Sequence, residues 1–259
     1  MSQFISVFDM FKIGVGPSSS HTLGPWRASQ EWISKLKKTQ VFLLTDNIKV
    51  DLYGSLSLTG KGHATDYAIL LGLSGADPEY VPIKDIDGII NSIKETNLLY
   101  LNNEKMISFS IDNINFNKEF LPLNPNGLTF TAFKDGEIIS KETYYSIGGG
   151  FIIQEEDSLV DEIEVTKQNL PYPINRAVEL DRYCIREKLS ISEIVFQNEL
   201  VINTEEKINS ELHRIWTEML ECIYVGCHTK GILPGGLNVK RRAFDCLLYT
   251  SPSPRDEVL

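Results

Sequence analysis

The alternation of apolar and polar positions predicts helices and strands in turn over the first 155 residues. Two amphipathic helices are expected, one after the glycine-rich segment 14–20 and one after the polar segment 54–63, and both segments are expected to be loops. Three runs with period-two alternation predict strands: Ile48, Val50 and Leu52; Ile107, Phe109 and Ile111; Leu128, Phe130 and Ala132. Asp135 and Gly136 are a hairpin-turn pair. The pattern therefore predicts an α/β domain over residues 1–155.

The pattern changes beyond this domain, where the strand signals disappear. Residues 156–175 are acidic and contain two prolines, which predicts an exposed linker. Ser190 and Glu193 then form a capping box, and Thr204 opens a long helix. The apolar stripe of that helix comprises Ile208, Leu212, Ile215, Met219 and Ile223. Residues 176–243 are thus expected to begin an all-helical domain, with an apolar surface left exposed.

The last sixteen residues, 244–259, differ in character from the rest of the chain. They contain repeated Ser-Pro turns and no helical period, and they resemble translated sequencing-adapter read-through. We expect a non-native tail here and leave it out of the predicted fold.

Charge and composition exclude several classes of function. The formal net charge of −10 repels phosphate backbones, and the basic cluster 240–242 is too short for a nucleic-acid footprint. No apolar run approaches the ~20 residues of a membrane helix, and the N-terminus lacks a signal-peptide pattern. The four cysteines have no metal-ligand spacing: Cys184, Cys222, Cys227 and Cys246. We expect a cytoplasmic protein that binds no nucleic acid, no membrane and, within this chain, no metal.

Two segments are candidates for binding an anion such as a carboxylate. Hydroxyls and an imidazole follow one another at a predicted helix entrance, beside unpaired backbone N–H groups: Ser18, Ser19, Ser20 and His21. The SIGGGF segment ends a predicted strand, and three successive glycines can form an anion-binding nest: Gly148, Gly149 and Gly150. Alternatively, one serine only caps the helix and the glycines only form a turn.

The segment GKGH is a candidate for proton transfer. Gly60 and Gly62 allow close approach of the backbone, while Lys61 supplies a cation and His63 a titratable base. Asp66 follows three residues later, a helical spacing that would let its carboxylate orient His63. The alternative is an exposed histidine at the start of a helix.

Six strings along the chain together resemble the iron-sulfur L-serine dehydratase family. They span residues 4–243 in the family's order and spacing: SVFDMFKIGVGPSSSHTLGP, VDLYGSLSLTGKGHATD, NGLTFTAF, YYSIGGGF, QNEL and GILPGGLNVKRRA. The resemblance implies an α/β domain like an allosteric substrate-binding domain, followed by a helical domain. It implies an L-serine ammonia-lyase of amino-acid catabolism, which forms pyruvate through an aminoacrylate. An open iron of a [4Fe-4S] cluster would be its Lewis acid, without pyridoxal phosphate.

The resemblance also implies roles for particular residues. It makes His63 the base that removes the α-proton, with His21 as the second candidate and Lys61 stabilising negative charge. The residues implied to bind L-serine are Ser18, Ser19, Ser20, Thr22, Asp66, Ser146, Gly148, Gly149 and Gly150. The complete enzyme is expected to be a homodimer that includes a further C-terminal helical domain.

The chain departs from the family pattern at two places. Many members carry a histidine where this chain has Asn124, and asparagine cannot gain a proton near neutral pH. The cluster-ligating cysteines of the family lie beyond the GILPGGLNVKRRA string, and none of the cysteines here occupies their positions. The chain alone is therefore expected to bind no cluster and to be an inactive fragment.

One alternative of a different class stays open, because a domain of this kind can bind serine as a regulatory sensor without catalysis. Ser/His hydrolysis is disfavoured, since adjacent serine and histidine rarely align and no G-x-S-x-G elbow is present. Use of pyridoxal through Lys61 is disfavoured as well.

Overall fold

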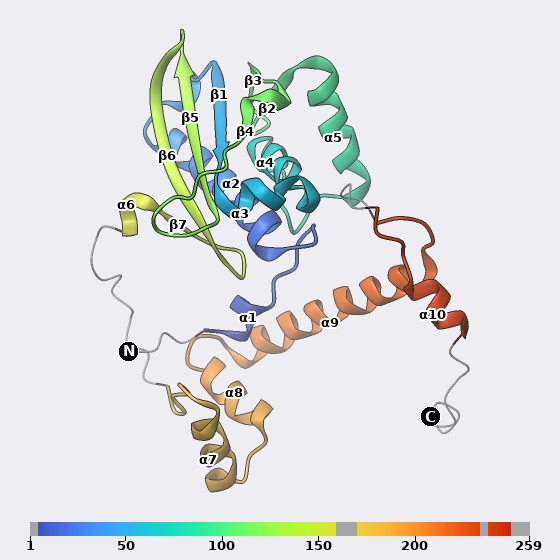
Figure 1. Cartoon of the computed structure of the whole chain (residues 1–259). Helices are drawn as coiled ribbons and strands as arrows, with labels where there is room; N and C mark the ends of the chain where they lie inside the picture. The colour runs from blue at the N-terminus through green and yellow to red at the C-terminus, as the bar shows by residue number, and fades with distance from the viewer. Residues whose placement is uncertain (1–4, 159–169, 234–237, 250–259) are drawn as a thin grey trace. The chain divides into compact units, whose positions relative to one another are not determined.

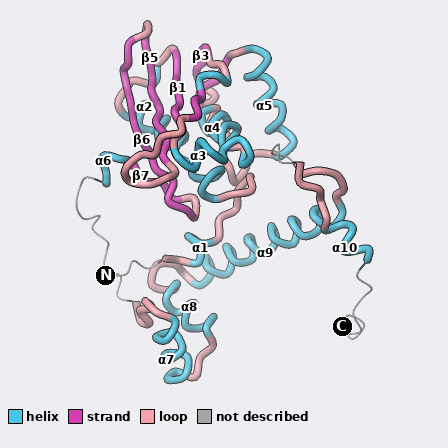
Figure 2. Tube along the Cα trace, in the orientation of Figure 1, coloured by secondary structure: helices cyan, strands magenta, loops and turns pink. Residues whose placement is uncertain are grey.

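The computed structural model describes residues 5–158, 170–233 and 238–249, which group into two compact units. One unit is α/β and begins at Ile13, and the other combines the residues up to Lys12 with the helices that follow residue 170. Figure 2 shows that the described strands all belong to the α/β unit. Most of the expected linker falls on residues 159–169, outside the described residues. The sequence pattern did not predict that the first residues group with the helical unit.

A five-stranded sheet forms the frame of the α/β unit (Figure 1), with the order β4-β1-β5-β6-β7. The strands are β1 (Asn47–Leu52), β4 (Ile114–Phe116), β5 (Gly127–Lys134), β6 (Glu137–Gly148) and β7 (Phe151–Gln154). Strands β1 and β4 are parallel, and the other neighbours are antiparallel. Asp135 and Gly136 turn between β5 and β6 with φ of 52° and 85°, which confirms the predicted hairpin.

Two helices that bury almost only apolar residues pack with the sheet to form the core. They are α2 (Gly24–Lys38), which contacts β5, β6 and β7, and α4 (Thr65–Leu73), which packs on α2. Trp32 of α2 is fully buried and stacks on Phe130 of β5 with 4.9 Å between ring centroids. Both helices and the strands β1 and β5 confirm the α/β prediction. Helix α2 buries the apolar positions that its period brings to one face, whereas α4 is buried on all sides from Ala68 to Leu73 and is therefore not the amphipathic helix expected from the sequence.

Several elements differ from those expected from the sequence. The first segment expected to be a loop is one as far as Ser18, where it enters a π-helical turn over Ser19–Leu23. The second is helical instead: Gly54–Thr59 form helix α3, and Gly60–His63 form a 3₁₀ turn. Ile111 begins a 3₁₀ turn instead of continuing a strand. The predicted strand at Ile107 is confirmed as β3 (Lys105–Ser108), but the pattern missed α5 (Ile83–Thr96) and the strand β2 (Leu98–Leu101), which pairs with β3 in a separate hairpin. Short segments of this kind fit several conformations by their local pattern alone.

The other unit consists of helices in its described part. They are α1 (Val7–Met10), α7 (Ala177–Glu187), α8 (Ile191–Glu199), α9 (Glu205–His228) and α10 (Ala243–Tyr249), while the short α6 (Glu155–Ser158) belongs to the α/β unit. The Ser190 capping box and the Thr204 N-cap are confirmed. Helix α10 corrects the expectation that no helical segment follows residue 243, and residues 250–259 lie outside the described part. None of the described helices is long and apolar enough to cross a membrane.

Helix α9 leaves most of its apolar stripe exposed, as expected. Ile208 is buried, whereas Leu212, Met219 and Ile223 are 40%, 45% and 57% exposed. At the N-terminal end of α9, a cavity of about 580 Å³ opens beside α8 and the N-terminal segment. Its walls are nearly all apolar and include Phe8 and Phe196. The helical unit thus presents apolar surface both on α9 and in this cavity.

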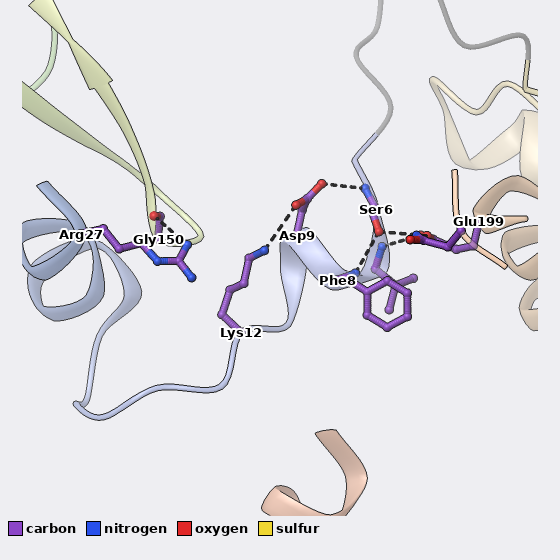
Figure 3. A network of polar contacts seen from close by, with 9 residues as sticks. Ser6, Phe8, Asp9, Lys12, Arg27, Gly150 and Glu199 are labelled. Atoms are coloured by element: carbon purple, nitrogen blue, oxygen red, sulfur yellow. Dashed lines mark hydrogen bonds and ion pairs between the residues drawn. The ribbon is translucent and has the colours of Figure 1, made fainter. Parts of the chain in front are cut away.

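A buried carboxylate holds the N-terminal segment within the helical unit. Glu199 is 2% exposed, and Figure 3 shows its side chain facing Ser6. Its Oε1 accepts a hydrogen bond from the Val7 N–H (2.7 Å), and its Oε2 accepts one from the Ser6 hydroxyl (2.9 Å). Ser6 also caps α1 in a capping box with Asp9, which pairs in turn with Lys12 (Figure 3). The carboxylate therefore satisfies donors at the start of α1 that would otherwise be unpaired.

We predict that Glu199→Gln destabilises the chain by about 1–3 kcal/mol. The substitution replaces one carboxylate oxygen of Glu199 by an NH₂ group, which would face the donor of Ser6 or Val7 instead of accepting a hydrogen bond from it. The measurement is the midpoint of urea unfolding followed by circular dichroism. The matched control is Glu221→Gln on the exposed surface of α9, which should leave the midpoint unchanged. Equal midpoints for the two variants would show that the Glu199 contacts contribute nothing to stability.

Candidate active site

The GPSSSHT segment winds into a tight turn at the start of α2. The hydroxyl of Ser18 accepts a hydrogen bond from the backbone N–H of His21 (3.3 Å), and Ser19–Leu23 form the π-helical turn. Gly24 lets this turn lie against β6, since a Cβ atom at Gly24 would be 2.0 Å from the Ser146 Oγ. Isolated π-helical turns are rare and concentrate at functional sites. The geometry thus singles out the same segment as the sequence.

Both ring nitrogens of His21 are engaged by hydroxyl groups. Its Nδ1 lies 2.9 Å from the Ser20 Oγ, and its Nε2 lies 2.9 Å from the Ser55 Oγ of α3. Burial lowers the pKa of His21, and the charge of the neighbouring His63 lowers this pKa further, while a hydrogen bond with the Ser55 backbone opposes the shift. The folded chain therefore favours the neutral form of His21.

His63 has a defined tautomer. It ends the 3₁₀ turn that follows α3, and its Nδ1 lies 2.9 Å from the carbonyl oxygen of Thr59. A carbonyl oxygen only accepts hydrogen bonds, so Nδ1 carries the proton of the neutral ring. The lone pair is then on Nε2, which has no hydrogen-bond partner among the described residues. This is the tautomer of the neutral ring that leaves Nε2 available to act as a general base.

Reciprocal hydrogen bonds hold the two histidine segments together. The Thr22 hydroxyl donates to the carbonyl of His63 (3.1 Å), and the Thr65 hydroxyl donates to the carbonyl of His21 (2.6 Å). The two imidazole rings lie 4.8 Å apart between centroids, tilted by 36°. Ala64, between His63 and Thr65, has the left-handed values φ 53° and ψ 38°. A residue with a Cβ adopts this conformation only where the surroundings impose it.

Lys61 and Asp66 lie beside His63, without a hydrogen bond to its ring. Lys61 is exposed, with its Nζ 5.2 Å from the centroid of the Phe116 ring. The Oδ1 of Asp66 accepts a hydrogen bond from the Tyr67 N–H at the start of α4 (3.0 Å), and burial raises the pKa of this carboxyl group. The structure thus corrects one expectation, because the Thr59 carbonyl, and not Asp66, holds the Nδ1 of His63.

Ser146 lies beneath the GPSSSHT turn. It is fully buried, and its hydroxyl has no hydrogen-bond partner among the described residues. Its main chain pairs with Asn126: the Ser146 N–H donates to the Asn126 carbonyl (3.0 Å), and the Asn126 amide donates to the Ser146 carbonyl (3.1 Å). The side chain of Asn124 accepts a hydrogen bond from the Asn126 N–H (2.9 Å). Asn124 therefore stabilises the turn that supports Ser146.

The three glycines of SIGGGF link β6 to β7. Gly148, Gly149 and Gly150 all have positive φ, at 97°, 60° and 76°, which explains why glycine occupies each position. The carbonyl of Gly150 accepts a hydrogen bond from the Arg27 guanidinium (3.2 Å), as Figure 3 shows. This contact ties the glycine turn to helix α2.

The sequence missed the residues that hold the histidines. Ser55, Thr59 and Thr65 supply partners to both imidazole segments, and Asn126 supports Ser146. The four-residue spacing of Ser55 and Thr59 is a helical signal, but the expected loop concealed it. The predicted site residues from Ser18 to Thr22 all lie in the π-helical turn or directly before it.

The described residues do not fit a metal cluster. The four cysteines form no disulfide in the described part of the chain, and no three histidine, cysteine, aspartate or glutamate side chains gather there into a metal-binding group. A [4Fe-4S] cluster requires several thiolate ligands at one place.

Comparison with known proteins identifies the family. The profile described as "Serine dehydratase beta chain" matches residues 6–157. An L-serine dehydratase of Haemophilus influenzae is 44% identical over 242 residues, and L-serine dehydratase 1 of Escherichia coli is 42% identical over 241 residues. Each alignment covers 92% of this chain and 53% of the relative. An L-serine dehydratase of Mycobacterium bovis is 38% identical over 258 residues, covering 98% of this chain and 56% of the relative.

The chain thus spans about half the length of the curated relatives that it matches. The matched range of the family profile contains both histidine segments and the SIGGGF turn, so the candidate site lies wholly within it. This chain belongs to the serine dehydratase family.

Proposed function

We propose that this chain is the serine-binding and proton-abstracting part of an L-serine ammonia-lyase, which converts L-serine into pyruvate and ammonia. The observation that carries the proposal is the free Nε2 of His63, whose tautomer the Thr59 carbonyl sets. The names of the relatives support L-serine as the substrate. The reaction needs such a base because the α-proton of serine is weakly acidic.

The residues present suit the first half of this reaction. The Nε2 of His63 takes the α-proton, the β-hydroxyl leaves as water, and the product is aminoacrylate. Aminoacrylate then becomes an imine that takes up one water and releases ammonia, so that serine yields pyruvate and ammonia overall. We assign to Lys61, two residues before His63, the stabilisation of negative charge that develops as the proton leaves.

The entrance of the π-helical turn suits the substrate carboxylate. Ser19 is exposed there, Ser18 and Ser20 are half-buried, and the first backbone N–H groups of the turn lack helical partners. A carboxylate at such a position gains charge-assisted hydrogen bonds and about 0.3–1 kcal/mol from the helix dipole. We therefore assign carboxylate binding to Ser18–Ser20.

Departure of the β-hydroxyl calls for a Lewis acid, which a [4Fe-4S] cluster would supply. The described part of this chain offers no ligand set for it. We propose that the ligands lie in the part of the relatives' length that this chain does not match, and that the chain alone is inactive. The proposal takes the complete enzyme to be a cytoplasmic homodimer that does not use pyridoxal phosphate.

We predict that His63→Ala in the complete protein, reconstituted anaerobically with iron and sulfide, lowers the turnover of L-serine by about 10² to 10⁴ with folding intact. Pyruvate formation measures the rate, and circular dichroism checks the fold. His213→Ala is the control, since His213 is exposed on α9. An unchanged rate for His63→Ala would remove His63 from the mechanism. Serine binding without turnover by the wild-type protein would instead favour a sensor.

We predict that His21 makes the chain less stable as the pH falls. The pKa of His21 in the folded chain is below its ordinary value of 6.5, so the unfolded chain binds the proton more readily. The free energy of unfolding therefore decreases as the pH falls through that value, and is unaffected by His21 well above it. Urea unfolding between about pH 7.5 and about pH 5.5 measures the decrease. In His21→Asn the free energy of unfolding should fall by less over this pH range. An identical fall in the variant and in the wild-type chain would contradict the prediction.

A further inference from the structure

A single turn of helix α3 contacts both histidines. The Ser55 Oγ lies 2.9 Å from the Nε2 of His21, and the Thr59 carbonyl lies 2.9 Å from the Nδ1 of His63. Ser55 contacts His21 through its side chain and Thr59 contacts His63 through its main chain, so the same helix reaches both rings. The Thr59 hydroxyl also donates to the Ser55 carbonyl (2.9 Å), which ties the two positions to each other.

The backbone around Ser55 is itself held firmly. The Ser55 N–H donates to the Pro125 carbonyl (2.8 Å), and the preceding Gly54 N–H donates to the Glu119 carbonyl (2.7 Å). Gly54 has φ +53°, and a Cβ atom there would lie 2.4 Å from the Pro125 oxygen. Only glycine permits this close approach, which fixes the start of α3 on the segment 119–127. The Ser55 hydroxyl is therefore presented to His21 from a rigid support.

The two histidines consequently differ in what they offer a substrate. His21 has a hydroxyl at each ring nitrogen, from Ser20 and Ser55, so it can take a proton from a substrate only by breaking a hydrogen bond. His63 has its Nε2 free among the described residues. The ring of His21 lies 4.8 Å from that of His63 and thus limits where the latter ring can move.

We propose that Ser55 is a positioning residue for the reaction: its hydrogen bond to the Nε2 of His21 holds that imidazole in place against His63, the base. In this arrangement His21 acts through His63 and is a positioning residue as well. The inference rests on the proposed function, because it assigns Ser55 a part in the same proton abstraction.

The first test compares activities in the complete, reconstituted protein. Ser55→Ala should lower kcat for L-serine by about 10- to 100-fold with little change in KM, since a displaced base costs rate more than binding. Ser57→Ala, two residues along the same helix, is the matched control and should leave both constants unchanged. Ser55→Thr keeps the hydroxyl and should recover most of kcat, whereas Ser55→Cys keeps the volume without a strong hydrogen bond and should not.

The second test needs no catalysis, because it follows the imidazole of His21 by proton NMR in the 259-residue chain. The chain has four histidines, and the spectrum of His21→Asn assigns the His21 resonance. The side-chain contact of Ser55 lies directly at the Nε2 of His21, so its loss changes the surroundings of that ring. Ser55→Ala and Ser55→Cys should therefore shift the ring resonances of His21, while Ser57→Ala and Ser55→Thr should not.

The outcomes separate this inference from the proposed function. Shifted His21 ring resonances and a lower kcat in Ser55→Ala and Ser55→Cys, with neither change in Ser57→Ala, support the positioning role. Unchanged His21 resonances, or an unchanged kcat despite shifted resonances, overturn the positioning role while the lyase activity stands. A complete wild-type protein that does not deaminate L-serine overturns the proposed function, whatever the NMR spectra show.

Discussion

Two threonine hydroxyls hold the candidate site together, one from each histidine segment. Thr22 donates to the carbonyl of His63, 41 residues away in sequence, and Thr65 donates to the carbonyl of His21, 44 residues away. The two histidine segments are therefore joined by two hydrogen bonds. Both threonines are buried, at 4% and 0% exposure. A buried hydrogen bond contributes only about 1 kcal/mol, but a buried carbonyl left without its donor costs more. The distance between the two rings depends on this pair of contacts.

Close backbone approach makes those contacts possible. Gly24 lets the π-helical turn rest on Ser146, and Gly54 lets α3 start against Pro125. At both places a Cβ atom would overlap its neighbour, so the glycines determine where the histidine segments can lie. The site is therefore assembled from main-chain packing first, and its side chains take their partners from that frame.

Much of the α/β frame could be predicted, because helix α2 and strands β1 and β5 have clear apolar periods. The helical character of residues 54–63 could not be predicted, because a short segment with alternating serine and leucine fits several conformations. Leu56 decides between them by becoming fully buried, a contact that depends on the rest of the fold. The same limit hid the role of Ser55, whose partner His21 is 34 residues away.

The sequence by itself determined the family and the residue types at the site, because the GPSSSHT and GKGH segments are local strings that need no fold to be recognised. It also placed His63 and His21 among the candidates. Only the tertiary structure decided how these two differ. The state of an imidazole depends on which groups face its two nitrogens, and those groups come from α3 and its neighbours across the fold.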